Sequence, residues 1–475
     1  MTLFQILVFC ILGVLIGRWR GASGRTWLLL VSSVMAIFWL QPGMPIRYLD
    51  FWFPVLTLAI TVLVWAVTRP DGLRALPRAD WLAGLVIAGL VLAIGLTRFV
   101  EPLCCLTPTR PPPLVQILLA ALLVAAAFVG LSRLSSRPAW LVNAFTVGLL
   151  LIFVVLKTEP LASDLSAGLR LLMQQNPDLA NALDLRWLGF SYVAFRLIHV
   201  LRDRVSGRLP ETGLADMVTF IIFFPAFTAG PIDRIQRFTP DLRQEYLLRA
   251  PQLLAAGERL VWGVFKKFVI ADTLALIALN SQNAGQINAA FWMWVVLYAY
   301  ALLIYFDFSG YTDIAIGLGM LMGIQLPENF NRPYLQKNLT QFWNSWHMTL
   351  AMWFRAYYFN PVTRALRARR RIPVVGIVLF GQLTTMVLIG LWHGVTWNFA
   401  IWGAWHGLGL FVHNRWSEFT RARFAVQTET TRRARLLNLG GVLVTFNFVA
   451  LGWVWFSLPS PQQALQVFSV LFGGG

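Results

Sequence analysis

The sequence predicts an all-α, polytopic membrane protein. Of its 475 residues, 57% are apolar and 13% are charged, whereas soluble domains carry about 25% charged residues. Apolar runs of about 17 to 25 residues recur along the chain, which is the length that crosses a hydrocarbon core roughly 30 Å thick. The runs are solidly apolar and lack the alternation of barrel strands. Their number favours about 11 to 12 spanning or re-entrant helices.

Six apolar segments open the chain, and the loops between them predict its orientation. The segments are 2–17, 26–40, 51–67, 81–96, 114–132 and 139–156. The five loops between them hold three, one, three, two and two arginines in chain order. Because Lys and Arg gather in cytoplasmic loops, we expect the odd loops to be cytoplasmic and the amino terminus external. The long sixth connection, 157–186, is expected outside.

The charge and the metal-type residues argue against two classes of partner. The net charge of +18 comes from 39 Lys and Arg against 21 Asp and Glu, an excess that membrane orientation requires. No nucleic-acid recognition motif accompanies it. The cysteines Cys10, Cys104 and Cys105 and the five histidines lack the spacing of metal ligands. We therefore predict no nucleic-acid partner and no metal site.

From about residue 187 onward the apolar runs contain polar and charged residues. Arg196 and His199 lie in one run, and Asp307 and Asp313 lie in another. Charges at membrane depth cost several kcal/mol unless they face a cavity or a partner. This half should therefore surround something wet, and the alternative is a purely structural polar network. We divide the chain into amino-terminal spanning helices, 1–160, and a core that carries the chemistry, 187–470.

Two apolar arms, 373–391 and 397–412, predict a hairpin whose tip carries His393. Basic clusters flank the arms and place both arm ends in the cytoplasm. The clusters are Arg364, Arg367, Arg369, Arg370 and Arg371, then Arg415, Arg421, Arg423, Arg432, Arg433 and Arg435. A last span follows at 437–456. A neutral imidazole is the usual general base near neutral pH, although a buried histidine can also be held by a hydrogen bond alone.

His347 is the second candidate. If the segment around it is helical, spacings of three and four place an aromatic stripe and this imidazole on one face. The stripe would consist of Trp343, Trp346, His347, Leu350 and Phe354. The alternative is an interfacial helix with aromatic anchors.

Several motifs resemble the membrane-bound O-acyltransferase family in order and spacing, over roughly residues 187–470. They are Gly230–Arg234, Phe265–Asp272, Tyr305–Tyr311, Pro327–Tyr334, Phe342–His347, Gly390–Gly394 and Trp402–Gly407. The resemblance implies a ring of helices around a central funnel, where a cytoplasmic acyl thioester meets an acceptor from the other side.

The resemblance also assigns roles. His393 would be catalytic and would take the proton of an acceptor hydroxyl as that hydroxyl attacks the thioester carbonyl. His347 would be the second essential residue, and His347 or Asn344 would polarise or orient the carbonyl. The residues expected to bind substrate are Asn344, Trp343, Trp346, Trp392, Arg355 and Asn329.

Two branches of the family compete for the substrate. Alginate-type enzymes pass acetyl groups from acetyl-coenzyme A to exported polysaccharide, and D-alanyl transfer proteins use a carrier protein's pantetheine thioester and teichoic acid. We predict an acetyl donor, no bound cofactor, and a hydroxyl of an extracytoplasmic polysaccharide or relay protein as acceptor. Membrane lipid and a secreted or membrane-anchored acyltransferase are expected partners in the bacterial inner membrane. D-alanyl transfer, a transporter or flippase, and a scaffold are the alternatives.

Overall fold

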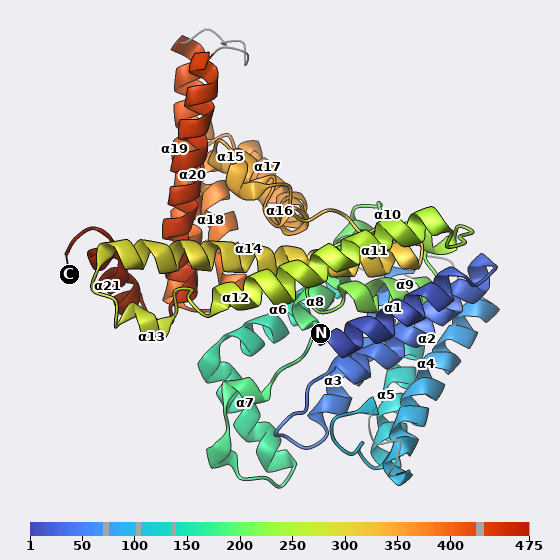
Figure 1. The fold of residues 1–475 in the computed structure, drawn as a ribbon. Helices are drawn as coiled ribbons and strands as arrows, with labels where there is room; N and C mark the ends of the chain where they lie inside the picture. The colour runs from blue at the N-terminus through green and yellow to red at the C-terminus, as the bar shows by residue number, and fades with distance from the viewer. Residues whose placement is uncertain (70–75, 101–105, 135–138, 424–431, 475) are drawn as a thin grey trace. The chain divides into compact units, whose positions relative to one another are not determined.

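The computed structural model describes residues 1–69, 76–100, 106–134, 139–423 and 432–474 (Figure 1). Every regular element in these ranges is a helix, so the all-α prediction is confirmed. Eight of the described helices are long and apolar enough to cross a membrane, and shorter apolar helices cover Leu3–Gly17 and Leu214–Ala226. The loop arginines Arg74 and Arg137 and the cysteines Cys104 and Cys105 lie outside the described residues.

The chain forms two compact units. The first unit holds residues 1–260 and 314–327, and the second holds 261–313 and 328–475. Helix α14, Ala290–Leu321, contributes residues to both units.

The first unit begins with the six predicted apolar helices. They are α1 Leu3–Gly17, α2 Ala22–Leu40, α3 Leu49–Thr68, α4 Arg78–Leu96, α5 Leu114–Ser132 and α6 Ala139–Lys157. The predicted boundaries hold to within a few residues, and the largest difference is at α2, which begins at Ala22 and not at residue 26. The unit continues with α7 Glu159–Leu172, α8 Phe190–Val205, α9 Leu214–Ile222, α10 Ile235–Arg243 and most of α11 Ala250–Phe265.

Contacts between loops of the first unit agree with the predicted alternation of its spans. The Gln175 side chain, in the sixth connection, accepts a 3.0 Å hydrogen bond from the backbone N–H of Arg47 in the second loop. Thr109, in the fourth loop, donates its backbone N–H to Asp50 at the start of α3, at 2.8 Å. The even connections therefore share one end of this unit, as consecutive antiparallel spans require.

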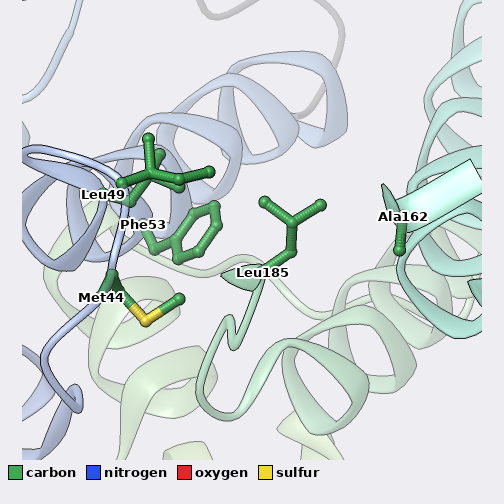
Figure 2. Packing of buried hydrophobic residues seen from close by; sticks show 6 residues of the cluster. Met44, Leu49, Phe53, Ala162 and Leu185 are labelled. Atoms are coloured by element: carbon green, nitrogen blue, oxygen red, sulfur yellow. The ribbon is translucent and has the colours of Figure 1, made fainter. Parts of the chain in front are cut away.

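Helix α7 packs one face on the loop between α2 and α3. The apolar cluster beneath it consists of Met44, Ile46, Leu49, Phe53, Ala162 and Leu185, and Figure 2 shows Met44, Leu49, Phe53 and Leu185 gathered together. Arg170 on the same face pairs with buried Asp184 at 2.8 Å. The opposite face of α7 carries exposed leucines, Leu161, Leu165 and Leu172.

Arg196 and His199, the polar residues in the apolar run of α8, bind backbone groups. Arg196, almost fully buried, donates to the carbonyl oxygens of Ile221 at 2.8 Å and Ala226 at 2.9 Å. These carbonyls lie where α9 ends and therefore lack helical partners. His199 Nε2 accepts the backbone N–H of Ile235 at 3.1 Å. The structural polar network thus accounts for both residues.

The second unit holds most of the sequence motifs. Its elements are the π-helical turn η6 Lys266–Ala271, α12 Asp272–Ala275, α13 Ser281–Ala284, residues 290–313 of α14, η7 Pro333–Leu335, α15 Leu339–Trp343, α16 Met348–Phe354, η8 Arg355–Phe359, α17 Asn360–Ala368, α18 Val374–His393, α19 Trp397–Arg423, α20 Arg432–Ser457 and α21 Pro461–Leu471. The two acids of α14 form ion pairs here, Asp313 with Lys266 at 2.7 Å and Asp307 with Lys267 at 2.5 Å.

The predicted hairpin is present as α18 and α19, which run side by side, and α20 lies along α19 (Figure 1). Glycines let the two helix backbones touch. A Cβ on Gly390 would lie 2.1 Å from the carbonyl oxygen of Phe399, and one on Gly403 would lie 2.4 Å from that of Met386. Small residues allow this close approach between membrane helices. The side chains of Arg421, Arg423 and Arg433 lie outside the described part of the chain.

Candidate active site

The segment around His347 is not the continuous helix that the spacing predicts. Helix α15 ends at Trp343 and α16 begins at Met348. His347 itself has φ 40° and ψ 53°, in the left-handed region, where few non-glycine residues occur. The prediction that Trp343 to Phe354 share one aromatic helix face is therefore wrong.

Hydrogen bonds from a distant segment hold this break in place. The backbone N–H of Met348 donates to the carbonyl oxygen of Asn329 at 3.0 Å, and that of Asn331 donates to the carbonyl oxygen of Ser345 at 3.0 Å. These bonds satisfy backbone groups near the break with partners from outside the helix. The motif Pro327–Tyr334 thus shapes the turn that carries His347.

The Asn329 side chain also binds the imidazole. Its Oδ1 atom lies 3.0 Å from His347 Nδ1, and it accepts from Thr349 through the backbone N–H at 3.3 Å and the hydroxyl at 2.9 Å. Asn329 is fully buried and His347 is 4% exposed. Among the described residues, His347 Nε2 has no hydrogen-bond partner. Burial lowers the pKa of His347 to about 3, so the ring is neutral at physiological pH.

One indole ring lies beside both predicted histidines. The Trp392 ring centre is 6.0 Å from that of His347 and 4.4 Å from that of His393. His393 is the last residue of α18 and is half-buried, with the Phe456 ring 4.7 Å away, centre to centre. The Phe308 ring approaches His347 edge-on at 4.7 Å. The structure therefore brings His347, Trp392 and His393 into one aromatic neighbourhood.

The other predicted residues divide between an aromatic core and a cavity. Trp346 packs into the core, with its ring centre 5.2 Å from Phe330 and 5.3 Å from Trp453. A cavity of about 200 Å³ lies next to α15, α18 and α19. Its lining is Thr340, Trp343, Asn344, Ala351, Arg355, Phe359, Gln382, Thr385, Met386, Ile389, Leu410 and Asn414.

Asn344 and Arg355 meet at this cavity and not at the imidazoles. Arg355 Nη2 donates to Asn344 Oδ1 at 2.7 Å, and both side chains line the cavity, whereas His347 and His393 do not. Ile389 on the cavity wall precedes His393 by four residues on α18, which is about 6 Å along a helix. The cavity therefore reaches to about one helical turn from His393.

The cavity also has a basic neighbourhood. Phe359 lines it and ends η8, and the next helix, α17, carries exposed Arg364 and Arg367. Further exposed arginines precede α18, at the opposite end of that helix from His393. Such a patch attracts anions. Among the described residues, no group of three or more His, Cys, Asp or Glu side chains could hold a metal ion.

Sequence reasoning gave no role to His406, although four of the five histidines cluster between residues 347 and 413. His406 is fully buried in α19. Its ring centre lies 5.2 Å from Trp343 at the cavity and 5.0 Å from Trp402. Thr349 was also missed, and its position two residues after His347 was the available signal.

The sequence model described as "MBOAT, membrane-bound O-acyltransferase family" matches residues 139–455. The chain is 33% identical to the probable alginate O-acetylase AlgI of Pseudomonas aeruginosa over 301 residues, which is 61% of this chain and 52% of that protein. It is 31% identical to the teichoic acid D-alanyltransferase of Bacillus subtilis over 281 residues, 57% of this chain and 68% of that protein.

A third relative is the peptidoglycan O-acetyltransferase of Helicobacter pylori, 35% identical over 288 residues, which cover 58% of this chain and 51% of that protein. The chain thus spans about half the length of the two O-acetylating relatives. The relatives are bacterial, and the long apolar helices make this chain a multi-pass membrane protein.

Proposed function

Because the chain is a member of the membrane-bound O-acyltransferase family, we propose that it transfers an acyl group, foremost acetyl, from a cytoplasmic thioester to a hydroxyl outside the cytoplasm. The observation that carries this proposal is the cavity, lined by Arg355 and Asn344, whose wall comes within about one helical turn of His393. In our proposal a thioester arm enters this cavity beside Phe359, which precedes the arginines of α17, and extends toward an imidazole.

His393 acts as the general base in this scheme. The acceptor oxygen forms a bond to the thioester carbonyl carbon while His393 takes the hydroxyl proton. The carbon–sulfur bond then breaks, and the proton passes from the imidazolium to the departing thiolate, so the ring returns to its neutral form. The position of His393 at a helix end, among Trp392, Phe456 and Trp402, supports this role. An aromatic shell excludes water that would hydrolyse the thioester.

The donor would enter through the cavity. Arg355, held by Asn344, offers a guanidinium to phosphate groups, and the exposed arginines of α17 add positive charge. Acetyl-coenzyme A and a carrier protein's pantetheine both bear phosphate next to the thioester arm. The cavity therefore suits either donor, and we favour acetyl-coenzyme A because two of the relatives named above are described as O-acetylating proteins.

The acceptor would be a hydroxyl of an envelope polysaccharide or of a relay protein. The relatives are named for alginate, peptidoglycan and teichoic acid, which all lie outside the cytoplasm. A secreted or membrane-anchored acyltransferase is the partner we propose for a relay. The second candidate is D-alanyl transfer, which the 31% identity to the D-alanyltransferase favours.

The test is transfer of radiolabel from acetyl-coenzyme A in membranes that hold this protein and the products of its neighbouring genes. We expect label in polymer or partner with the native chain and none with His393→Ala. If only a D-alanyl carrier thioester supports transfer, the acetyl assignment fails and the family mechanism stands. Equal transfer by both chains removes His393 from the mechanism, and a native chain that moves solute without acyl transfer identifies a transporter.

A further inference from the structure

We propose that Asn329 is a positioning residue that locks His347 in its Nδ1–H tautomer, so that Nε2 receives a hydrogen bond from the incoming acceptor hydroxyl. The inference rests on the proposed acyl transfer. It reverses the expected role of His347, because a nitrogen that accepts a hydrogen bond cannot polarise a thioester carbonyl.

The argument starts with the orientation of the Asn329 amide. Its Oδ1 atom lies 3.3 Å from the backbone nitrogen of Thr349, whose N–H can only donate. Turning the amide over would place an NH2 group against that N–H, and donors would face each other. The backbone N–H of Thr349 therefore places the oxygen of the amide, and not its nitrogen, at this position.

The same oxygen fixes the tautomer of His347. An amide oxygen accepts and never donates, so the Nδ1 atom 3.0 Å away must carry the proton. A neutral imidazole has one N–H, and Nε2 is therefore left with a lone pair. The burial that lowers the pKa of His347 to about 3 keeps the ring neutral.

The environment of Nε2 indicates what it receives. Among the described residues it has no hydrogen-bond partner, and the His347 side chain is more than nine-tenths buried. Phe308 and Trp392 flank the ring. A buried acceptor without a donor is costly, and the acceptor hydroxyl is the O–H donor that the proposed reaction brings beside Trp392.

The two imidazoles then act in sequence. The hydroxyl first donates to His347 Nε2, which holds its oxygen near the thioester. Rotation about the carbon–oxygen bond turns the hydrogen toward His393, which removes it as the oxygen attacks. Carbonyl polarisation belongs to another group, and His347 remains neutral throughout.

The test compares Asn329→Leu, Asn329→Asp and a matched control, Ser345→Ala, in acyl transfer from acetyl-coenzyme A. Leucine removes the acceptor that holds Nδ1–H, and we expect turnover to fall about 100-fold, which is what misplacement of a reacting group by about 1 Å costs. Aspartate keeps an acceptor and should recover much of that loss at pH 8. Ser345 is buried in the same turn, bonds to Gln341 and Phe342 carbonyls and should tolerate alanine.

The pH profile separates this role from a structural one. A carboxylate at position 329 raises the pKa of His347, so the activity of Asn329→Asp should begin to fall at a higher pH than that of the native chain, in which only protonation of His393 removes the base. Equal loss with leucine and aspartate at every pH, with both variants folded by thermal denaturation, would overturn the tautomer lock. Native-like turnover of Asn329→Leu would do the same. If the native chain transferred no acyl group, or transferred it equally well without His393, the proposed function would instead be overturned.

Discussion

Arg355 donates a 2.7 Å hydrogen bond to the side-chain oxygen of Asn344 across the break between α15 and α16. The bond ties a cation to the cavity wall, where a phosphate-bearing donor would pass. It also separates Asn344 from His347, with which the family resemblance had grouped it.

Arg355→Ala should weaken binding of acetyl-coenzyme A more than it slows chemistry. A hydrogen bond to a charged group contributes about 1.5 to 3 kcal/mol, and solvent exposure of Arg355 reduces this. We expect KM to rise about threefold to tenfold with little change in kcat. S-acetyl-N-acetylcysteamine lacks phosphate, and its KM should stay native. An equal rise for both donors would show that Arg355 acts on the cavity shape and not on phosphate.

Gly390→Ala should displace His393. The added methyl group would lie 2.1 Å from the carbonyl oxygen of Phe399, which forces α18 and α19 apart about one turn before His393. We expect lower thermal stability and loss of transfer. Gly376→Ala on the same helix is the control, because its Cβ would meet Ile372 at an ordinary 3.4 Å. Full activity of Gly390→Ala would mean that the hairpin adapts without moving His393.

Stability should fall in acid because His347 is buried as a neutral ring. Its pKa drops from 6.5 to about 3 on folding, so below pH 6.5 the unfolded chain binds a proton that the folded chain does not. The contribution of His347 to the free energy of unfolding is therefore complete above pH 6.5. It falls by about 1.4 kcal/mol per pH unit as the pH drops from 6.5 toward 3. Thermal denaturation in detergent between pH 7.5 and 5 measures the slope. His347→Gln should show a shallower slope, and identical slopes would refute the assignment.

Lys266→Met should destabilise the second unit more than Lys267→Met. Both lysines pair with acids of α14, but the Asp313 side chain is 12% exposed and the Asp307 side chain is 49% exposed. Removing one partner of a buried pair leaves a poorly solvated charge, whereas an exposed acid stays hydrated. Denaturation midpoints of the two variants in the same detergent test the order. If Lys267→Met lowered the midpoint more than Lys266→Met, the Asp313 carboxylate would be the better hydrated of the two acids.

Periodicity predicted the spans and the hairpin because both depend on local apolar runs. Helices α1 to α6 and the arms of α18 and α19 appear at the expected positions. The predicted helix through His347 is wrong because Asn329, 18 residues earlier, holds a turn there. No local sequence pattern encodes a hydrogen bond to a distant segment. The lining of the cavity could not be predicted for the same reason, because Gln382 and Asn414 come together from different helices.

Helix α7 buries a polar contact and exposes several leucines on its outer face. Ser166 and Arg170 point inward to Asp184, whereas Leu161, Leu165 and Leu172 face outward. Only Thr158 separates α7 from the span α6, so these leucines extend the lipid-facing surface of that span past its end. Solubilisation must therefore shield this connection as well as the spans, and a detergent micelle matched only to the hydrocarbon thickness would leave its leucines in water.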